Sequence, residues 1–123
     1  MAIYHCHCQV ISRGQGRSAV AAAAYRSGEK ITNSYDGVTH DYRKKKGIVY
    51  KEIMLCENAP EEWKDRALFW NNIEQAERDT AARLAREFEI ALPVELSTEE
   101  QIDFVRAFVH ENFVNIGMCA DFA

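Results

Sequence analysis

The sequence predicts an α/β fold of the α+β kind, a two-layer sandwich in which helices flank a mainly antiparallel sheet. Two observations carry this prediction. Segments with the apolar period of helices alternate with short segments of strand character along the chain. The length of 123 residues, of which 47% are hydrophobic, suits one domain with a buried core and is too short for two. We therefore expect a single domain over residues 1–123.

The first element is a strand expected over Ala2–Ser12, whose side chains alternate between two faces. His5 and His7 would share one face, and such a His-x-His pair is a geometry that a metal ion can use. No third ligand is evident in the sequence, so ordinary strand histidines are the simpler interpretation.

A basic loop, Arg13–Arg17, leads into a short helix that Ser18 is expected to cap. Four consecutive alanines, Ala21–Ala24, replace the large apolar side chains that usually fill the inner face of a helix. At helical spacing, positions 18, 21, 22 and 25 fall on one side, so Tyr25 projects from a shallow surface of small residues.

Tyr25 is a candidate nucleophile. Arg17, Arg26 and Lys30 flank it in the sequence, and a phenol beside several cations can be stabilised as phenolate, which attacks a phosphodiester. The alternative is that Tyr25 is a packing residue with a hydrogen-bonded tip, as most tyrosines are.

The segment Ile31–Lys46 is expected to be a loop, because Asn33-Ser34 and Asp36-Gly37 are turn signals. It ends in the densest positive charge of the chain, which would either clamp a DNA backbone or lie solvated on a loop. A strand is expected over Gly47–Leu55. The candidate DNA contacts of this half are Arg13, Arg17, Arg26, Lys30, Arg43, Lys44, Lys45 and Lys46.

Acidic residues after Pro60 predict the start of a helix that runs to about Arg78. Strong helix formers continue it through Asp79–Ala85. A strand is then expected over Glu87–Leu92, with the carboxylates of Glu87 and Glu89 on one face. Such a pair is tolerable in water, or opposite a cation or a histidine cluster.

The last helix has the most specific start signal in the chain. Ser97 and Glu100 form a capping box, which predicts a helix to about Asn112. The apolar segment Met118–Ala123 has strand character, so we expect the domain to be incomplete at this C-terminal end.

Charge is divided unevenly along the chain. Residues 1–51 hold nine Lys and Arg against three Asp and Glu, whereas residues 52–123 hold six against sixteen. The basic half could form a face that meets phosphates, or simply be solvated. No apolar run is long enough for a membrane span and the start lacks a signal peptide, so a cytoplasmic protein with reduced cysteines is expected.

Three separated blocks resemble MobA/MobL (MobQ-type) conjugative relaxases, which belong to the HUH endonuclease superfamily. They are the opening MAIYHCHCQVISRGQGRSAVAAAAYRSGEKI, the block LFWNNIEQAE and the block AREFEIALPVELS. The resemblance covers essentially the whole chain. It implies a relaxase palm, an antiparallel sheet with flanking helices.

The resemblance also implies a reaction. Tyr25 matches the tyrosine that attacks a scissile phosphate in single-stranded DNA at the transfer origin, which yields a 5′-phosphotyrosine and a free 3′-hydroxyl and permits rejoining. Glu87 matches an acidic position near the metal-binding histidines, where it would orient one of them. Accessory mobilisation proteins and a type IV coupling protein are the expected partners.

One departure from the family pattern concerns the metal, expected to be Mg²⁺ or Mn²⁺ in a complete domain. The family's histidine ligands would lie beyond Ala123, so no metal ligand is assigned here and little activity is expected of this chain alone. The missing strand would leave an open edge that invites oligomerisation.

Other functions remain open from the sequence. The first is a non-catalytic module that binds single-stranded DNA through the basic half of the chain. Another is a small metal-binding or interaction protein built on His5 and His7. A rolling-circle replication initiator shares the chemistry, but the three blocks fit relaxases better.

Overall fold

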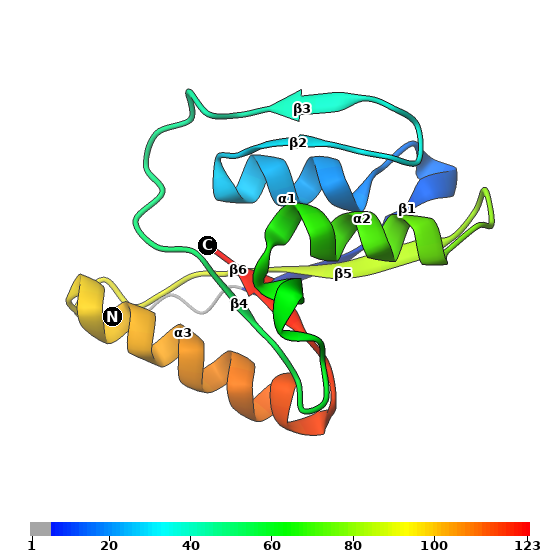
Figure 1. Ribbon diagram of the computed structural model, residues 1–123. Coiled ribbons are helices and arrows are strands. Elements are labelled where there is room, and N and C mark those ends of the chain that lie inside the picture. The colour runs from blue at the N-terminus through cyan, green and yellow to red at the C-terminus, as the bar shows by residue number, and fades with distance from the viewer. Residues whose placement is uncertain (1–5) are drawn as a thin grey trace.

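Helices and antiparallel strands alternate along the computed structural model, which describes residues 6–123 (Figure 1). The mixed composition confirms the expected α+β class. The strands are β1 (Cys6–Ser12), β2 (Lys30–Thr32), β3 (Thr39–Asp41), β4 (Glu52–Met54), β5 (Arg83–Ile90) and β6 (Ala120–Phe122). The α-helices are α1 (Ala19–Ser27), α2 (Arg66–Ala76) and α3 (Thr98–Asn112), and 3-10 turns span Arg13–Gln15, Glu61–Lys64 and Val114–Ile116.

The strands pair in three separate antiparallel ladders within residues 6–123, in place of one continuous sheet. β1 pairs with β5, β2 with β3, and β4 with β6. The β1–β5 ladder is the long one, and it sets Gln9 opposite Glu87 and His7 opposite Glu89. Because side chains alternate along a strand, these four residues share one face of the ladder.

Helices α1 and α2 pack on this same face of the β1–β5 ladder, to which Ile11 also belongs, and Arg26 of α1 pairs there with Glu87. One core cluster joins Ile11 and Leu84 from the strands to Ala19 of α1, with Trp70 and Ile73 of α2 packed against it. The alanines of α1 let its backbone approach its neighbours closely, which explains why a helix with so few large apolar residues is half buried.

Helix α1 begins and ends as its sequence dictates. The Ser18 hydroxyl accepts a hydrogen bond from the Ala21 N–H, which caps the helix as expected. Gly28 ends it in the left-handed region, at φ 68°. A side chain at this position would also collide with Ile48, whose Cδ1 would lie 2.4 Å from the added Cβ.

The prediction that helix continues through Asp79–Ala85 is wrong. Helix α2 ends at Ala76, and β5 begins at Arg83. The guanidinium of Arg13 donates to the backbone carbonyls of Glu74 and Glu77, at the helix end where carbonyls lack a partner within the helix, and to that of Asp79, which also accepts from the Ala82 N–H. Tertiary contact therefore overrides local helix propensity here.

Two further segments differ from expectation, and one agrees. The segment expected to be a loop contains the β2–β3 hairpin, in which the Thr32 and Thr39 hydroxyls lie 2.8 Å apart. The strand expected over Gly47–Leu55 is confined to β4. The Ser97–Glu100 capping box is present at the start of α3.

A buried ion pair attaches β6 to α2. The Asp121 carboxylate accepts hydrogen bonds from Arg66 Nε, at 2.9 and 2.8 Å, and from Trp70 Nε1, at 2.8 Å. The side chains of Arg66 and Asp121 are 8% and 2% exposed. Among the helices of residues 6–123, none combines the length and apolar character that a membrane crossing demands.

Candidate functional site

An open pocket of about 830 Å³ lies between helix α1 and the β1–β5 ladder. Ser18, Ala21, Ala22 and Tyr25 all line it, so the small-residue face expected of this helix borders an actual concavity. The opposite wall contains polar side chains from both strands, namely His7, Gln9, Glu87 and Glu89. A polar, open pocket of this kind suits a charged, extended ligand better than a small apolar one.

Tyr25 is 56% exposed and is held from two directions. The ring of Tyr42 meets it edge to face, with ring centroids 5.2 Å apart. Lys45 Nζ lies 3.7 Å from the centroid of the Tyr25 ring and donates a hydrogen bond of 2.8 Å to the Tyr25 carbonyl. The phenol is thus accessible yet fixed, and one cation lies against its ring.

Glu87 forms ion pairs with both arginines that line the pocket, Arg17 and Arg26. Its carboxylate accepts a 2.6 Å hydrogen bond from Arg26 and a 3.3 Å hydrogen bond from Arg17, while the Gln9 amide donates to it at 3.1 Å. Burial alone would raise the pKa of Glu87, but the hydrogen bonds and charges of Arg26 and then Arg17 outweigh burial and lower it. The carboxylate is therefore charged at neutral pH, and it fixes both guanidinium groups.

The two carboxylates of β5 lie in different surroundings. Glu87 faces the arginines, and Glu89 lies opposite His7 in the ladder. His40 of β3 also lines the pocket, and its buried Nε2 has no hydrogen-bond partner among residues 6–123. No sequence pattern singled out His40 beforehand, because it lies in the hairpin that was expected to be a loop.

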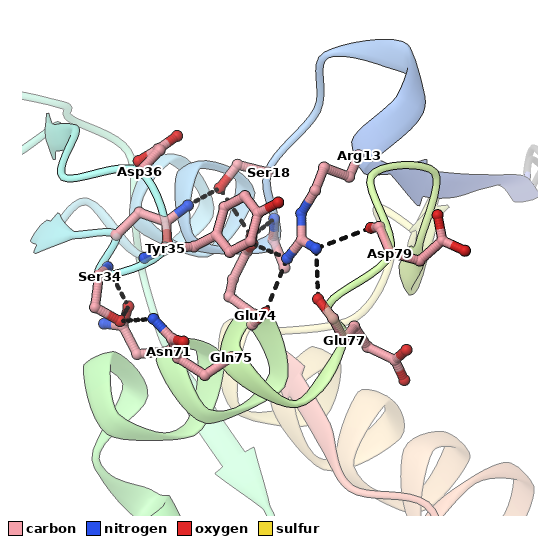
Figure 2. Close-up of polar contacts among 12 residues, drawn as sticks. Arg13, Ser18, Ser34, Tyr35, Asp36, Asn71, Glu74, Gln75, Glu77 and Asp79 are labelled. Atoms are coloured by element: carbon pink, nitrogen blue, oxygen red, sulfur yellow. Dashed lines mark hydrogen bonds and ion pairs between the residues drawn. The ribbon is translucent and has the colours of Figure 1, made fainter.

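Arg13, a candidate DNA contact from the sequence, is engaged by the protein itself (Figure 2). Its side chain is 10% exposed, forms a 2.8 Å ion pair with Glu74 and stacks 3.7 Å from the centroid of the Tyr35 ring. Figure 2 also shows the guanidinium reaching the carbonyls of Glu77 and Asp79. These contacts give Arg13 a structural role between β1, α2 and the segment before β5.

Glu74 is the important residue that sequence reasoning missed. Its carboxylate binds Arg13 and also accepts hydrogen bonds from the Ser18 hydroxyl, at 3.0 Å, and from the Ala19 N–H, at 2.8 Å. It is 1% exposed. A charged residue on the apolar side of the α2 pattern was the one available signal, since a buried carboxylate requires partners.

The remaining candidate DNA contacts are Lys30, Arg43, Lys44, Lys45 and Lys46. Arg43 is paired with Asp41 at 2.8 Å, and both side chains are largely exposed. Lys45 contacts Tyr25, as described. Lys30, Lys44 and Lys46 are exposed. Lys30 and Arg43–Lys46 are called the basic rim below, and Lys45 is the member that lines the pocket.

Within the described part of the chain, residues 6–123, the side chains do not form a metal site. No group of three or more His, Cys, Asp or Glu side chains suited to a metal ion occurs within residues 6–123. His5, one half of the His-x-His pair considered from the sequence, lies outside the described residues. His7 alone does not make a site.

The family model of the MobA/MobL family matches residues 17–123. The chain belongs to the MobA/MobL family. The pocket that Tyr25, Arg17, Arg26 and Glu87 border is therefore a feature of a MobA/MobL protein.

Curated relatives of this MobA/MobL chain bear names from conjugation. The chain is 41% identical over 132 residues to "Conjugal transfer protein TraA" of Rhizobium radiobacter, which covers 98% of the chain and 12% of that relative. It is 41% identical over 123 residues to "Mobilization protein MobL" of Acidithiobacillus ferridurans, which covers 100% of the chain and 32% of the relative. The chain thus spans less than a third of the length of either protein.

A solved structure described as "Molecular Basis of Vancomycin Resistance Transfer in Staphylococcus aureus" has the same fold. The TM-score is 0.92 at 32% sequence identity, and the match covers 98% of the chain and 61% of the solved one. The arrangement of ladders and helices in this chain therefore also occurs in that solved protein.

Proposed function

We propose that this MobA/MobL chain nicks DNA by transesterification, with Tyr25 as the nucleophile. The observation that supports the proposal most strongly is the placement of an exposed tyrosine at a polar pocket beside two arginines and a lysine. Cations and an accessible phenol are what attack on a phosphodiester requires.

In the proposed step, the phenolic oxygen of Tyr25 attacks the scissile phosphorus in line with the leaving 3′-oxygen. The new bond joins phosphorus to the tyrosine oxygen, and the bond between phosphorus and the 3′-oxygen breaks. The phenolic proton passes to solvent and the departing 3′-oxygen takes one from solvent, so the net result is a free 3′-hydroxyl. Since the product is a phosphodiester like the substrate, attack by that hydroxyl can rejoin the strand without an energy source.

Arg17 and Arg26 would neutralise the phosphate oxygens. Glu87 cancels one of their two charges and holds both in place, so the group presents one net positive charge in a fixed arrangement. Fixed charges stabilise a transition state without the cost of reorganisation. The role suggested by the resemblance, in which Glu87 orients a metal-binding histidine, stays a prediction.

The proposal includes no metal-dependent step. Mg²⁺ or Mn²⁺ is expected from the resemblance, but residues 6–123 offer no suitable ligand cluster. What the chain's own residues contribute is the nucleophile, the arginines beside it and the basic rim that would follow the DNA backbone.

Single-stranded DNA at a transfer origin is the proposed substrate, in the cytoplasm. Accessory mobilisation proteins and a coupling protein are the proposed partners, by analogy with relatives named for conjugal transfer and mobilisation. The basic rim, comprising Lys30, Arg43, Lys44, Lys45 and Lys46, would bind the strand on either side of the scissile phosphate.

The test is a nicking assay on oligonucleotides that span the cognate transfer origin, with the protein expressed at the full length of its reading frame. We expect a covalent protein–DNA adduct, and we expect Tyr25→Phe to abolish it. Tyr42→Phe is the matched control, because Tyr42 is the neighbouring ring and retains its aromatic contact as phenylalanine.

Two outcomes would contradict the proposal. If Tyr25→Phe nicked as fast as the parent protein, the nucleophile would be misassigned. If the parent protein bound single-stranded DNA in a salt-dependent manner without ever forming an adduct, the alternative of a non-catalytic binding module would hold.

A further inference from the structure

Two of the four cysteines lie against each other, far from the Tyr25 pocket in sequence. Cys56 follows β4, Cys119 precedes β6, and their Sγ atoms are 3.3 Å apart. The backbone N–H of Cys56 also donates to Cys119 Sγ, at 3.4 Å. The other two cysteines, Cys6 and Cys8, are exposed on β1.

The antiparallel β4–β6 ladder fixes this meeting. Glu52 pairs with Phe122 and Met54 with Ala120, which is the last pair of the ladder. Position 56 therefore lies beside position 119 just after this last pair. The buried ion pair of Asp121 with Arg66 anchors the same strand. The two thiols are therefore neighbours because of the fold, and their separation in sequence is 63 residues.

We propose that Cys56 and Cys119 are a reversible thiol–disulfide pair, oxidised by exchange with a low-molecular-weight disulfide. A disulfide bond needs the sulfur atoms to approach by roughly 1 Å more, which side-chain rotation can supply. This site is independent of the proposed DNA chemistry.

The exchange proceeds in two balanced steps. The thiolate of one cysteine attacks oxidised glutathione, whose S–S bond breaks to release one glutathione thiol and leave a mixed disulfide. The second cysteine attacks the protein sulfur of the mixed disulfide, so that the protein S–S bond forms and the second glutathione leaves. Two electrons pass from the protein to the oxidant, and the two thiol protons end on glutathione.

Proximity decides which product accumulates. The two cysteine sulfurs lie 3.3 Å apart, so the second thiol competes at a very high effective concentration with glutathione in solution for the mixed disulfide. Burial raises the pKa of Cys119, and the N–H of Cys56 only partly offsets this effect, so the first step should be slow at neutral pH. An isolated exposed thiol has no such neighbour and stops at the mixed disulfide.

The test uses the double variant Cys6→Ser/Cys8→Ser, in which only the proposed pair remains. After incubation with oxidised glutathione and acid quenching, we expect both thiols to disappear together. Trypsin should yield one cross-linked species that joins residues 52–64, which contain Cys56, to the peptide that begins at Ala107 and contains Cys119. Dithiothreitol should restore both thiols.

The additional variant Cys56→Ser in the same background is the control, and it should give only the glutathione mixed disulfide at Cys119. The proposal would be overturned if the parent double variant also stopped at mixed disulfides. It would equally be overturned if the folded protein did not react under conditions in which the same protein, unfolded in guanidinium, is oxidised.

Thermal unfolding gives an independent readout. The bond closes a long loop, so oxidation should raise the melting temperature of the double variant by roughly 10 °C. An oxidised form that melts at or below the temperature of the reduced form would show that the native fold does not accommodate the bond, and would contradict the proposal.

Discussion

Glu87 determines how the two arginines of the pocket are arranged. Arg17 and Arg26 both donate to its carboxylate, and Gln9 holds the same group from the facing strand. Removing the negative charge would leave two guanidinium groups to repel each other in a half-buried pocket. The ion pairs of Glu87 therefore affect both the stability of the fold and the electrostatic potential at Tyr25.

The lowered pKa of Glu87 predicts a pH dependence of stability. Its ordinary carboxyl value is 4.5, and the folded value is lower, so its contribution is complete above about pH 5 and is lost as pH falls through the folded pKa. We expect the unfolding free energy of Glu87→Gln to be about 1 kcal/mol below that of the parent protein at pH 7, and the difference to shrink as the pH falls below the ordinary carboxyl value of 4.5. Glu89→Gln is the control, because no arginine contacts Glu89 within residues 6–123. A difference that stayed constant with pH would contradict the ion-pair account.

Lys45 should affect the reaction through the orientation of Tyr25. Lys45→Gln removes the cation above the ring, and with it about 1 kcal/mol of interaction, so the rate of adduct formation should fall about fivefold. Lys64→Gln provides a matched control, since Lys64 pairs with Glu61 and does not line the pocket. Equal rates for the two variants would show that Lys45 does not position the phenol.

For individual residues, the sequence predicted those positions that follow from the spacing of side chains within one helix. The face formed by Ser18, Ala21, Ala22 and Tyr25 follows from helical spacing, and the structure places all four at one pocket. The engagement of Arg13 by Glu74 could not be predicted, because the two residues are 61 positions apart and their meeting depends on how α2 packs.

Among the elements, α1 is the one whose ends most constrain the pocket. Ser18 caps its start, and Gly28 turns the chain sharply one residue after its last turn. Tyr25 lies in that last turn, so any change in the exit of the chain moves the phenol and the basic rim relative to each other.

Gly28 adopts a positive φ and also leaves space for the Ile48 side chain. The contributions of these two requirements to stability can be separated experimentally. Gly28 and Gly37 both have positive φ, at 68° and 76°, but only at Gly28 would a Cβ meet a neighbour, the Ile48 side chain. We expect Gly37→Ala to cost about 1 kcal/mol of unfolding free energy, from backbone strain alone, and Gly28→Ala to cost about 2 kcal/mol, because the terminal methyl group of Ile48 must also turn aside. Urea unfolding measures both. Similar costs would mean that Ile48 moves aside freely.

Elements with strong local signals were predicted, and those that depend on distant partners were not. The capping box before α3 satisfies its own backbone groups, so it needs no tertiary context. The β2–β3 hairpin has strands of three residues, too short for a visible alternation. The end of α2 is set by Arg13, and neither the propensity of residues 79–85 nor a breaker residue indicated it.

At the scale of the whole molecule, the Arg13–Glu74 pair connects the parts that border the pocket. Arg13 follows β1 and binds α2 and the segment before β5, while Glu74 binds the start of α1. Both side chains are nearly inaccessible to solvent. The pair joins four elements around one buried ion pair, so it should be sensitive to loss of either partner.

Glu74→Gln tests this connection with minimal change of shape. The variant leaves the Arg13 guanidinium without its counter-ion, and we expect a loss of about 3 kcal/mol of unfolding free energy. Glu77→Gln is the matched control, because only the backbone carbonyl of Glu77 contacts Arg13. That variant should lie within about 0.5 kcal/mol of the parent protein. If the two variants unfolded at the same urea concentration, the pair would not be the connection described here.

The central claim is that the phenolic oxygen of Tyr25 becomes bonded to DNA, and peptide mapping of the adduct tests it most directly. Trypsin releases residues 18–26, SAVAAAAYR, in which Tyr25 is the one tyrosine, whereas Tyr35 and Tyr42 fall together in residues 31–43. After nuclease trimming, mass spectrometry of the adduct should place the nucleotide on Tyr25 in the peptide 18–26. A nucleotide on the peptide 31–43, or on any residue other than Tyr25, would contradict the account.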